Sequence, residues 1–386
     1  MIPPRTSRLA VVLASTTQMF GCVAEEPLPQ PSWCEAQPDA VDYRGTIEMW
    51  SFGVPLGELC EGSWERAQEH ADWVAEIWGE GEGFGYALYD SAENVCWPCP
   101  DFAQACFAYG GVQSPVFPDR HEITHAVRPG KCYSLIEEGF AELYGNYFRV
   151  LGSGTDLTEV LQWIDERGSL EGEYYGTATR FVAFLIDRAG VEPLRRLCDY
   201  PIESSADFDL ALQEVYGETL DAIMLVYQDF PDDVKHLTWN LRQDLACEME
   251  EQNIVTSPAN WTMDLRCGAP GVEGRRGRWL MTHQLVDIPE PGVYSFSFTA
   301  DRPLIVEFEL RNCTREETAS IYTILSTWAA PTGTLEAGVP WSFATEGGMP
   351  AGLYVLRVRI RDIDDAVAPG SIDDTVMLDL GVAPVP

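Results

Sequence analysis

The chain has 386 residues, 46% of them hydrophobic, which is enough sequence for two domains that each bury a core of their own. This composition excludes a largely disordered chain. The formal net charge of −36 repels nucleic acid and anionic lipid, so we expect no nucleic-acid partner.

The first 21 residues are typical of a secretion signal. Arg5 and Arg8 precede an apolar run at residues 9–14, which is too short to span a membrane. Residues 19–22, at the end of this segment, read M-F-G-C. This sequence resembles the lipobox of bacterial lipoproteins, whose cysteine is acylated. We predict a signal peptide at residues 1–21, a lipid anchor through Cys22 and a Pro- and Glu-rich tether at residues 22–42, with plain cleavage and release as the alternative. The protein is expected to be exported.

Setting Cys22 aside leaves ten of the 11 cysteines. An even number in an exported chain predicts disulfides, five if all of them pair, although the pairing cannot be read from the sequence. The segment Cys96-Trp97-Pro98-Cys99 has the form of a redox C-x-x-C motif. We interpret it as a structural staple, with a redox centre or a second zinc site as the alternatives.

Three strands and one helix are predicted before the most informative motif. Strand character at residues 46–52, 84–89 and 107–112 indicates a small sheet. Apolar residues three and four positions apart predict a helix at residues 63–78. These elements begin a domain that we place at residues 43–230.

Residues 121–125 read H-E-I-T-H, an intact H-E-x-x-H motif. Because positions i and i+4 share one face of a helix, His121 and His125 can reach one Zn²⁺ ion. Glu122 would then lie beside the ion, where its carboxylate can accept a proton from a zinc-bound water. Asp119 and the proline before it favour a helix start, and Pro129-Gly130 favours a helix end. The alternative is a surface helix with two solvated histidines.

A catalytic zinc site needs a third protein ligand, which we expect in the apolar helical pattern at residues 134–144. Glu138 is our choice, and its neighbour Glu137 is the alternative. Glu138 begins the sequence E-G-F-A, and here the chain resembles the gluzincins, the thermolysin-like and aminopeptidase-like zinc peptidases, whose second helix carries a ligand glutamate in an E-G-x-A context. The resemblance implies that Glu142 hydrogen-bonds a zinc-bound imidazole. Thermolysin-like members have an aspartate there, so Glu142 is a departure.

Residues 173–190 resemble the pattern Y-x-x-A-x-x-F-V-x-x-L-I-x-x-x-G of many bacterial gluzincin-like peptidases. Tyr175 falls on the tyrosine of that pattern. Its hydroxyl is expected to donate a hydrogen bond to the oxyanion that forms when water attacks an amide. Tyr174 is the alternative donor, and simple aromatic packing at a helix start is the alternative role.

Further helices are predicted at residues 156–167, 208–217 and 219–230, and a helical connector at residues 231–251. Beyond it, strict alternation at residues 294–298, 304–310 and 354–360 is typical of half-buried antiparallel strands. We therefore predict a β-sandwich at residues 252–386. The strand starts P-G-V-Y and A-G-L-Y, which end in Tyr294 and Tyr354, resemble those of bacterial pre-peptidase C-terminal domains.

The predicted fold class is α+β. A zincin-like catalytic domain, with a small N-terminal sheet, the H-E-x-x-H helix and a helical C-terminal lobe, precedes an antiparallel β-sandwich. We predict an exported zinc metallopeptidase for peptide or protein substrates. The small sheet resembles the N-terminal lobe of gluzincins, and this resemblance implies that the substrate backbone pairs with an edge strand beside the metal, a role that we assign to residues 107–112. The alternative is a surface binding protein with an inactive peptidase-like domain. His70, His236 and His283 match none of these motifs and are interpreted as structural or surface residues.

Overall fold

In the computed structural model, contacts divide the chain into residues 1–36 and residues 37–386, and the described residues all belong to the second unit. They are residues 38–79, 83–90, 105–108, 111–128, 132–145, 156–230, 254–274, 280–313, 324–325, 334–345, 348–362 and 376–385. The signal segment, Cys22, most of the tether, the C-x-x-C motif, His236 and the connector at residues 231–251 lie outside these ranges. Among the described helices, none has the length and apolar composition needed to cross a membrane.

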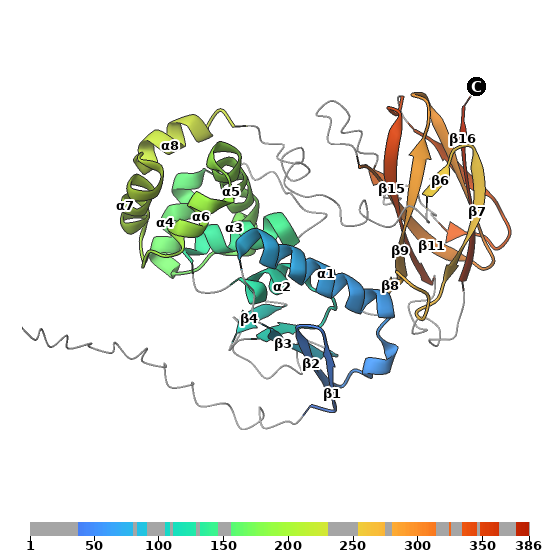
Figure 1. Ribbon diagram of the computed structural model, residues 1–386, viewed down its shortest axis with the longest axis horizontal. Coiled ribbons are helices and arrows are strands. Elements are labelled where there is room, and N and C mark those ends of the chain that lie inside the picture. Colours follow the sequence, from blue (N-terminus) through green and yellow to red (C-terminus); the bar gives the residue numbers. More distant parts are fainter. Residues whose placement is uncertain are drawn as a thin grey trace, which may run out of the picture. The chain divides into compact units, whose positions relative to one another are not determined.

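A five-stranded mixed sheet begins the described chain (Figure 1). The strands β2, β3 and β5 run parallel, whereas β1 and β4 are antiparallel edge strands. The spatial order is β1-β2-β3-β5-β4, and the bounds are β1 (Ala40–Arg44), β2 (Ile47–Phe52), β3 (Phe84–Tyr89), β4 (Cys106–Ala108) and β5 (Gly111–Ser114). The predicted strands at residues 46–52 and 84–89 are therefore confirmed.

The prediction of a single strand at residues 107–112 is wrong. The structure has two short strands in this region, β4 and β5, which pair antiparallel with Ala108 opposite Gly111. The glycine pair at residues 110 and 111 was a signal in the sequence against one continuous strand, since glycine weakens a strand interior. Among the described strands, β4 is the last on this side of the sheet.

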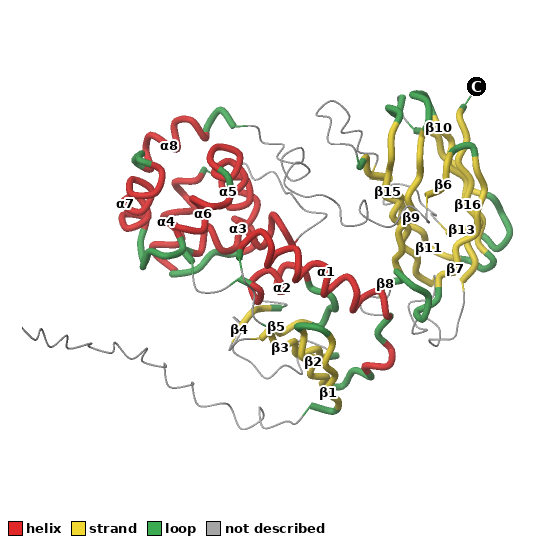
Figure 2. The backbone as a smooth tube through the Cα atoms, in the orientation of Figure 1, coloured by secondary structure: helices red, strands yellow, loops and turns green. Residues whose placement is uncertain are grey.

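The described residues contain eight α-helices, all of them between residues 61 and 227 (Figure 2). Most of these helices match the predicted ranges. Their bounds are α1 (Glu61–Trp78), α2 (Arg120–Val127), α3 (Ser134–Gly145), α4 (Leu157–Arg167), α5 (Tyr175–Ala189), α6 (Val191–Leu197), α7 (Ser205–Tyr216) and α8 (Leu220–Tyr227). α6 was not predicted because it contains Pro193. This proline lies in the first turn, where a missing N–H removes no intrahelical hydrogen bond.

One hydrophobic core joins the sheet and the helices of residues 38–230. It contains apolar side chains of every helix from α1 to α8, together with side chains of β2, β3 and β5. α1 shows why the pattern folds as it does, since Trp64, Ala67, Ala71 and Val74 recur every three or four residues and are all buried. α2 packs against β4, β5, α1 and α3, so the H-E-x-x-H helix lies between the sheet and the helical part.

The described residues beyond 254 form two sheets around a second hydrophobic core. One has the order β14-β10-β16-β7. The other has the order β12-β11-β15-β9-β6, with β13 also paired to β11 and β8 to β9. The bounds are β6 (Ile254–Thr256), β7 (Ala259–Leu265), β8 (Glu273–Gly274), β9 (Leu280–Ile288), β10 (Tyr294–Ala300), β11 (Leu304–Asn312), β12 (Ile324–Leu325), β13 (Thr334–Leu335), β14 (Trp341–Ala344), β15 (Gly352–Asp362) and β16 (Val376–Pro384). The three predicted alternating strands correspond to β10, β11 and β15, and the chain as a whole is α+β.

Two disulfides join described cysteines. Cys60, which precedes α1, is bonded to Cys267, which follows β7. Cys132, which precedes α3, is bonded to Cys198, which follows α6. Cys106 and Cys313 are also disulfide-bonded. These bonds agree with the prediction of a disulfide-stabilised chain, and such bonds are compatible with an exported protein.

Candidate metal centre

The helix α2 begins at a well-formed N-terminal cap. The side chain of Asp119 accepts a hydrogen bond from the backbone N–H of Glu122, with a distance of 3.3 Å between the heavy atoms. The Ser114 hydroxyl donates to the same carboxylate at 2.8 Å, which ties the cap to the end of β5. A capped first turn fixes the direction of the helix. The side chains of His121 and His125 therefore project from the same face of α2 in a defined direction.

Three side-chain atoms converge at this face. The Nε2 atoms of His121 and His125 lie 3.2 Å apart. Glu138 Oε2 lies 3.3 Å from the former and 3.4 Å from the latter. Donors bound at about 2.0–2.1 Å to a tetrahedral Zn²⁺ ion lie roughly 3.3–3.4 Å from one another, so the triangle has the size that such an ion needs. His121, His125 and Glu138 also form the group of potential metal ligands found among the described residues.

The carboxylate oxygen in this triangle is itself informative. Glu138 Oε2 is buried, and within the described part of the chain it has no hydrogen-bond partner of good geometry. A buried carboxylate oxygen that lacks a hydrogen bond needs a compensating positive charge, which the imidazoles supply in the metal-free protein and a bound cation would supply in their place. The donor set of two imidazoles and one carboxylate matches the ligand set of catalytic zinc sites. The residues present therefore fit the ion that the motif implies.

Each histidine also has a carboxylate on the ring nitrogen that faces away from the triangle. Glu142 Oε2 lies 3.3 Å from Nδ1 of His121. Glu137 Oε1 lies 3.7 Å from Nδ1 of His125, an electrostatic contact longer than a hydrogen bond. Both contacts are ion-pair contacts rather than hydrogen bonds of good geometry, and carboxylates at these positions are able to orient the rings. Of the adjacent residues Glu137 and Glu138, only the second joins the triangle.

Two glycines of α3 allow the helices of the site to approach closely. A Cβ atom at Gly139 would lie 2.5 Å from the carbonyl oxygen of Ala178 on α5. A Cβ atom at Gly145 would lie 2.4 Å from the Cα atom of His121 on α2. Both distances are impossible for a real side chain, so only glycine permits these contacts. The glycine of the E-G-x-A sequence therefore brings α5, which carries Tyr175, against the helix of Glu138.

Glu122 is buried beside the triangle. Burial raises the pKa of its carboxyl group to about 7, with a further increase from Asp119 and an opposing effect of the two histidines. A carboxyl group with a pKa near neutrality can both accept and return a proton at neutral pH. Because Glu122 follows His121 directly, it does not share the position of the two imidazoles on α2.

The charges of the triangle stabilise one another. Burial would raise the pKa of Glu138, but the charges of His125 and His121 lower it well below its ordinary value. Burial would likewise lower the pKa of His125, but Glu138 and Glu137 raise it to about 9. The pKa of His121 is raised for the same reason, through Glu138 and Glu142. In the metal-free protein, the charged imidazoles and the carboxylates around them therefore compensate one another.

Tyr175 lies against the triangle, and Tyr174 does not. The ring of Tyr175 stacks on that of His121, with centroids 5.6 Å apart and planes at 7°. Burial and the charge of Glu138 raise the pKa of its hydroxyl, so this group stays protonated and can donate a hydrogen bond. Tyr174 instead contacts Trp163, with ring centroids 5.4 Å apart. Of the two tyrosines that the sequence left open as hydrogen-bond donors, only Tyr175 therefore lies next to the triangle.

The side chain of His70, on α1, contacts the H-E-x-x-H helix α2, a role that the sequence did not reveal. It is fully buried, and its Nε2 lies 3.0 Å from both the carbonyl oxygen of Arg120 and the hydroxyl of Thr124. No spacing relates His70 to the H-E-x-x-H motif, so only the fold brings them together. His283 is buried too, where it accepts a hydrogen bond at 2.8 Å from Nε of Arg357. Neither histidine joins the triangle, in agreement with their structural interpretation.

Comparisons with known proteins add little to this geometry. No family model matches the chain, and no curated protein matches it. Among solved structures, the pre-peptidase C-terminal domain of a collagenase from Bacillus anthracis is similar at 12% identity and a TM-score of 0.20. That match covers 34% of this chain and 95% of the collagenase domain.

Proposed function

We propose that the protein is an exported zinc-dependent metallopeptidase of the gluzincin type, with His121, His125 and Glu138 as metal ligands. The observation that carries this proposal is the triangle of Nε2, Nε2 and Oε2 atoms with edges of 3.2, 3.3 and 3.4 Å. Its size is that of three corners of a zinc tetrahedron. The fourth corner would then accept water or substrate.

The chemistry divides between the ion and the protein. Held by His121, His125 and Glu138, a Zn²⁺ ion would supply Lewis acidity toward a water molecule and the scissile carbonyl group. Glu122 accepts the proton of the attacking water and delivers it to the leaving amine, for which a pKa of about 7 is well suited. The Tyr175 hydroxyl donates a hydrogen bond to the developing oxyanion. Glu142 and Glu137 orient the imidazoles of His121 and His125 through their Nδ1 atoms.

The arrangement of elements supports a zincin-like reading of residues 43–230. The short strand β4 is an antiparallel edge of the first sheet, and α2 packs against it. An extended peptide that paired with this edge would lie beside the H-E-x-x-H helix. We propose β4, in place of the strand predicted at residues 107–112, as the strand that binds the substrate backbone.

The test uses the mature protein and three measurements. Metal analysis is expected to give one zinc per chain, and a peptide-library digest is expected to show cleavage that chelation abolishes and added zinc restores. Glu122→Gln is expected to bind zinc and to be inactive, whereas His121→Ala is expected to lose the metal. Wild-type rates in a Glu122→Gln protein would refute the mechanism. A folded, zinc-free and inactive wild-type protein would favour the surface binding function instead.

A further inference from the structure

Adjacent glutamates on α3 both face His125. Glu138 Oε2 lies 3.4 Å from Nε2 of this residue, and Glu137 Oε1 lies 3.7 Å from Nδ1. Either carboxylate is chemically able to bind a divalent cation, because zinc accepts oxygen ligands from any glutamate within reach. A metal site of defined geometry needs a physical reason why one of them ligates and the other does not.

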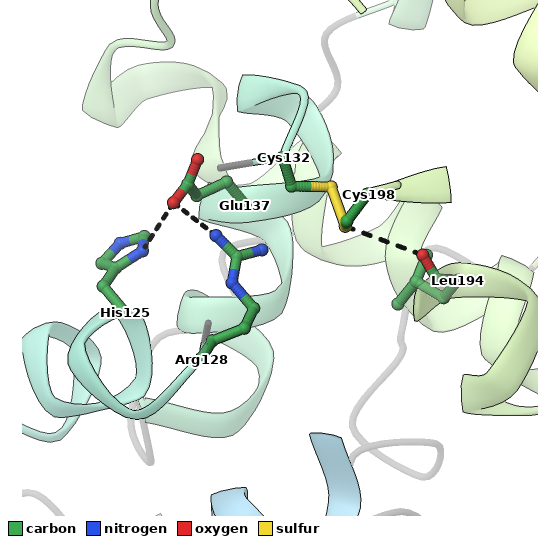
Figure 3. Close-up of a disulfide and its surroundings, with 6 residues drawn as sticks. All are labelled: His125, Arg128, Cys132, Glu137, Leu194 and Cys198. Atoms are coloured by element: carbon green, nitrogen blue, oxygen red, sulfur yellow. Dashed lines mark hydrogen bonds and ion pairs between the residues drawn. A yellow bond between two sulfur atoms is a disulfide. The ribbon is translucent and has the colours of Figure 1, made fainter. Parts of the chain in front are cut away.

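The reason why only Glu138 would bind the metal is a buried cation at the C-terminal end of α2. Arg128 directly follows the last residue of this helix, and its side chain is only 2% exposed. Its guanidinium forms an ion pair with Oε1 of Glu137, the same oxygen that faces His125 (Figure 3). It also lies over the ring of Trp78, 5.3 Å from the centroid. A buried guanidinium requires a counter-charge, so Arg128 holds Glu137 firmly.

The backbone on both sides of this ion pair is fixed. Arg128 ends α2, and Glu137 lies in the first turn of α3. Cys132 lies between them and is bonded to Cys198, whose Sγ is 3.7 Å from the carbonyl oxygen of Leu194 on α6 (Figure 3). Cys132, just before α3, is therefore attached covalently to the residue that follows α6. This bond limits the movement of the start of α3, which carries Glu137.

We propose that Arg128 is a positioning residue of the metal centre. By pairing with Glu137, it keeps this carboxylate on Nδ1 of His125 and outside the coordination sphere, and so leaves Glu138 as the carboxylate ligand. Glu142 does not compete in the same way, because it meets His121 at Nδ1, away from the converging Nε2 atoms. This inference rests on the proposed zinc site, whose ligands it takes as given.

The test measures metal binding rather than turnover. Zinc affinity is determined by competition with a chromophoric chelator, and the donor set is read from the visible spectrum of the cobalt(II)-substituted protein. Arg128→Gln is expected to weaken zinc binding by about 10- to 100-fold, the range found when partners of metal ligands are removed. Its cobalt spectrum is expected to change, because the released Glu137 can enter the coordination sphere. Arg128→Lys, which keeps the charge, is expected to recover part of the affinity.

Two further variants make the result specific. Glu137→Gln is expected to weaken zinc binding in the same direction, and the double variant Arg128→Gln/Glu137→Gln is expected to lose less than the sum of the two, because both act on His125. The control is Glu218→Gln, which removes the partner of Arg188 in a more exposed ion pair on α5. Its zinc affinity is expected to match that of the wild type.

The outcomes separate the two proposals. A wild-type protein without zinc affinity would refute the proposed function. A wild-type protein that binds zinc, with a folded Arg128→Gln variant of equal affinity and unchanged cobalt spectrum, would refute the positioning role alone. If Arg128→Gln does not fold, Glu137→Gln decides, because the side chain of Glu137 is 25% exposed and its loss is tolerated more easily. Unchanged zinc affinity in that variant would overturn the inference.

Discussion

The ring of Tyr175 lies parallel to that of His121, with planes at 7° and centroids 5.6 Å apart. The stacking places a protonated phenol beside the imidazole of His121, on a helix that α3 approaches through Gly139. The contact joins α2 and α5, which are more than 45 residues apart in sequence. Tyr175 therefore has two properties that a mutation can separate: its ring packs against His121, and its hydroxyl can donate a hydrogen bond.

We expect Tyr175→Phe to remove the donor and keep the stacked ring. Loss of one oxyanion donor typically costs about 100- to 1,000-fold in kcat, and we expect a loss of this order with unchanged zinc affinity. Steady-state kinetics and metal analysis check both parts. Tyr174→Phe is the matched control, because that ring contacts Trp163 instead, and we expect it to keep wild-type turnover. Full activity in Tyr175→Phe would leave this tyrosine with a packing role only.

Gly139→Ala is expected to destabilise the fold and the site together. The new Cβ atom would lie 2.5 Å from the carbonyl oxygen of Ala178, so α3 and α5 must separate. Overpacking of this kind costs about 1–3 kcal/mol, measurable as the free energy of unfolding in urea. Gly172→Ala is the control, since no atom lies within 4 Å of its added Cβ, and we expect a change below about 0.5 kcal/mol. Equal stability of the two variants would contradict the close packing.

The stability of the metal-free protein is expected to fall as the pH rises from about 6.5 to 9. The pKa of His125 is raised to about 9 in the fold, so its contribution is complete below its unfolded-state pKa of about 6.5 and is lost through pH 9. The raised pKa of His121 acts in the same direction. Glu122, with a pKa raised to about 7, adds to the loss up to that pH.

Thermal unfolding in the presence of a chelator measures this slope. Bound zinc is expected to flatten it, because the ion takes the place of the protons on the imidazoles and binding releases those protons. Calorimetric titration with zinc in buffers of different ionisation enthalpy should therefore report net proton release at pH 7. A metal-free Tm that rises between pH 6.5 and 9 would contradict the charges assigned to His125 and His121.

The two disulfides are expected to differ in their effect on the metal site. Cys132→Ser/Cys198→Ser opens a loop of sequence separation 66, and the chain-entropy relation gives a loss of about 4 kcal/mol. Because Cys132 lies between Arg128 and Glu137, we also expect weaker zinc binding. Cys60→Ser/Cys267→Ser, with a separation of 207, should lower stability without this effect on zinc. Chelator competition under non-reducing conditions compares them, and equal zinc affinities would contradict the distinction.

Helical spacing predicted that His121 and His125 share one face of a helix, and the structure brings both to Glu138. Glu138 and Glu142 were selected by the resemblance to the E-G-x-A helix of gluzincins, since periodicity alone left Glu137 open. Spacing within a helix is predictable because it depends only on neighbours in the chain. The alternating strands at β10, β11 and β15 were predictable for the same reason.

What the sequence did not reveal depends on contacts between distant elements. His70 lies 50 residues before Arg120, whose carbonyl it contacts, and nothing in its spacing indicates this. The pairing of Arg128 with Glu137 depends on how the chain turns between α2 and α3. The choice between Glu137 and Glu138, or between Tyr174 and Tyr175, needed the rotation of a helix about its axis, which a periodic pattern defines only coarsely.

The bond between Cys60 and Cys267 closes all of the helices α1 to α8 into one covalent ring. A single proteolytic cut anywhere between these two cysteines would leave both products attached to each other. The chain could therefore be nicked once without losing either part by diffusion. On a denaturing gel, such a nicked molecule would separate into fragments only after reduction.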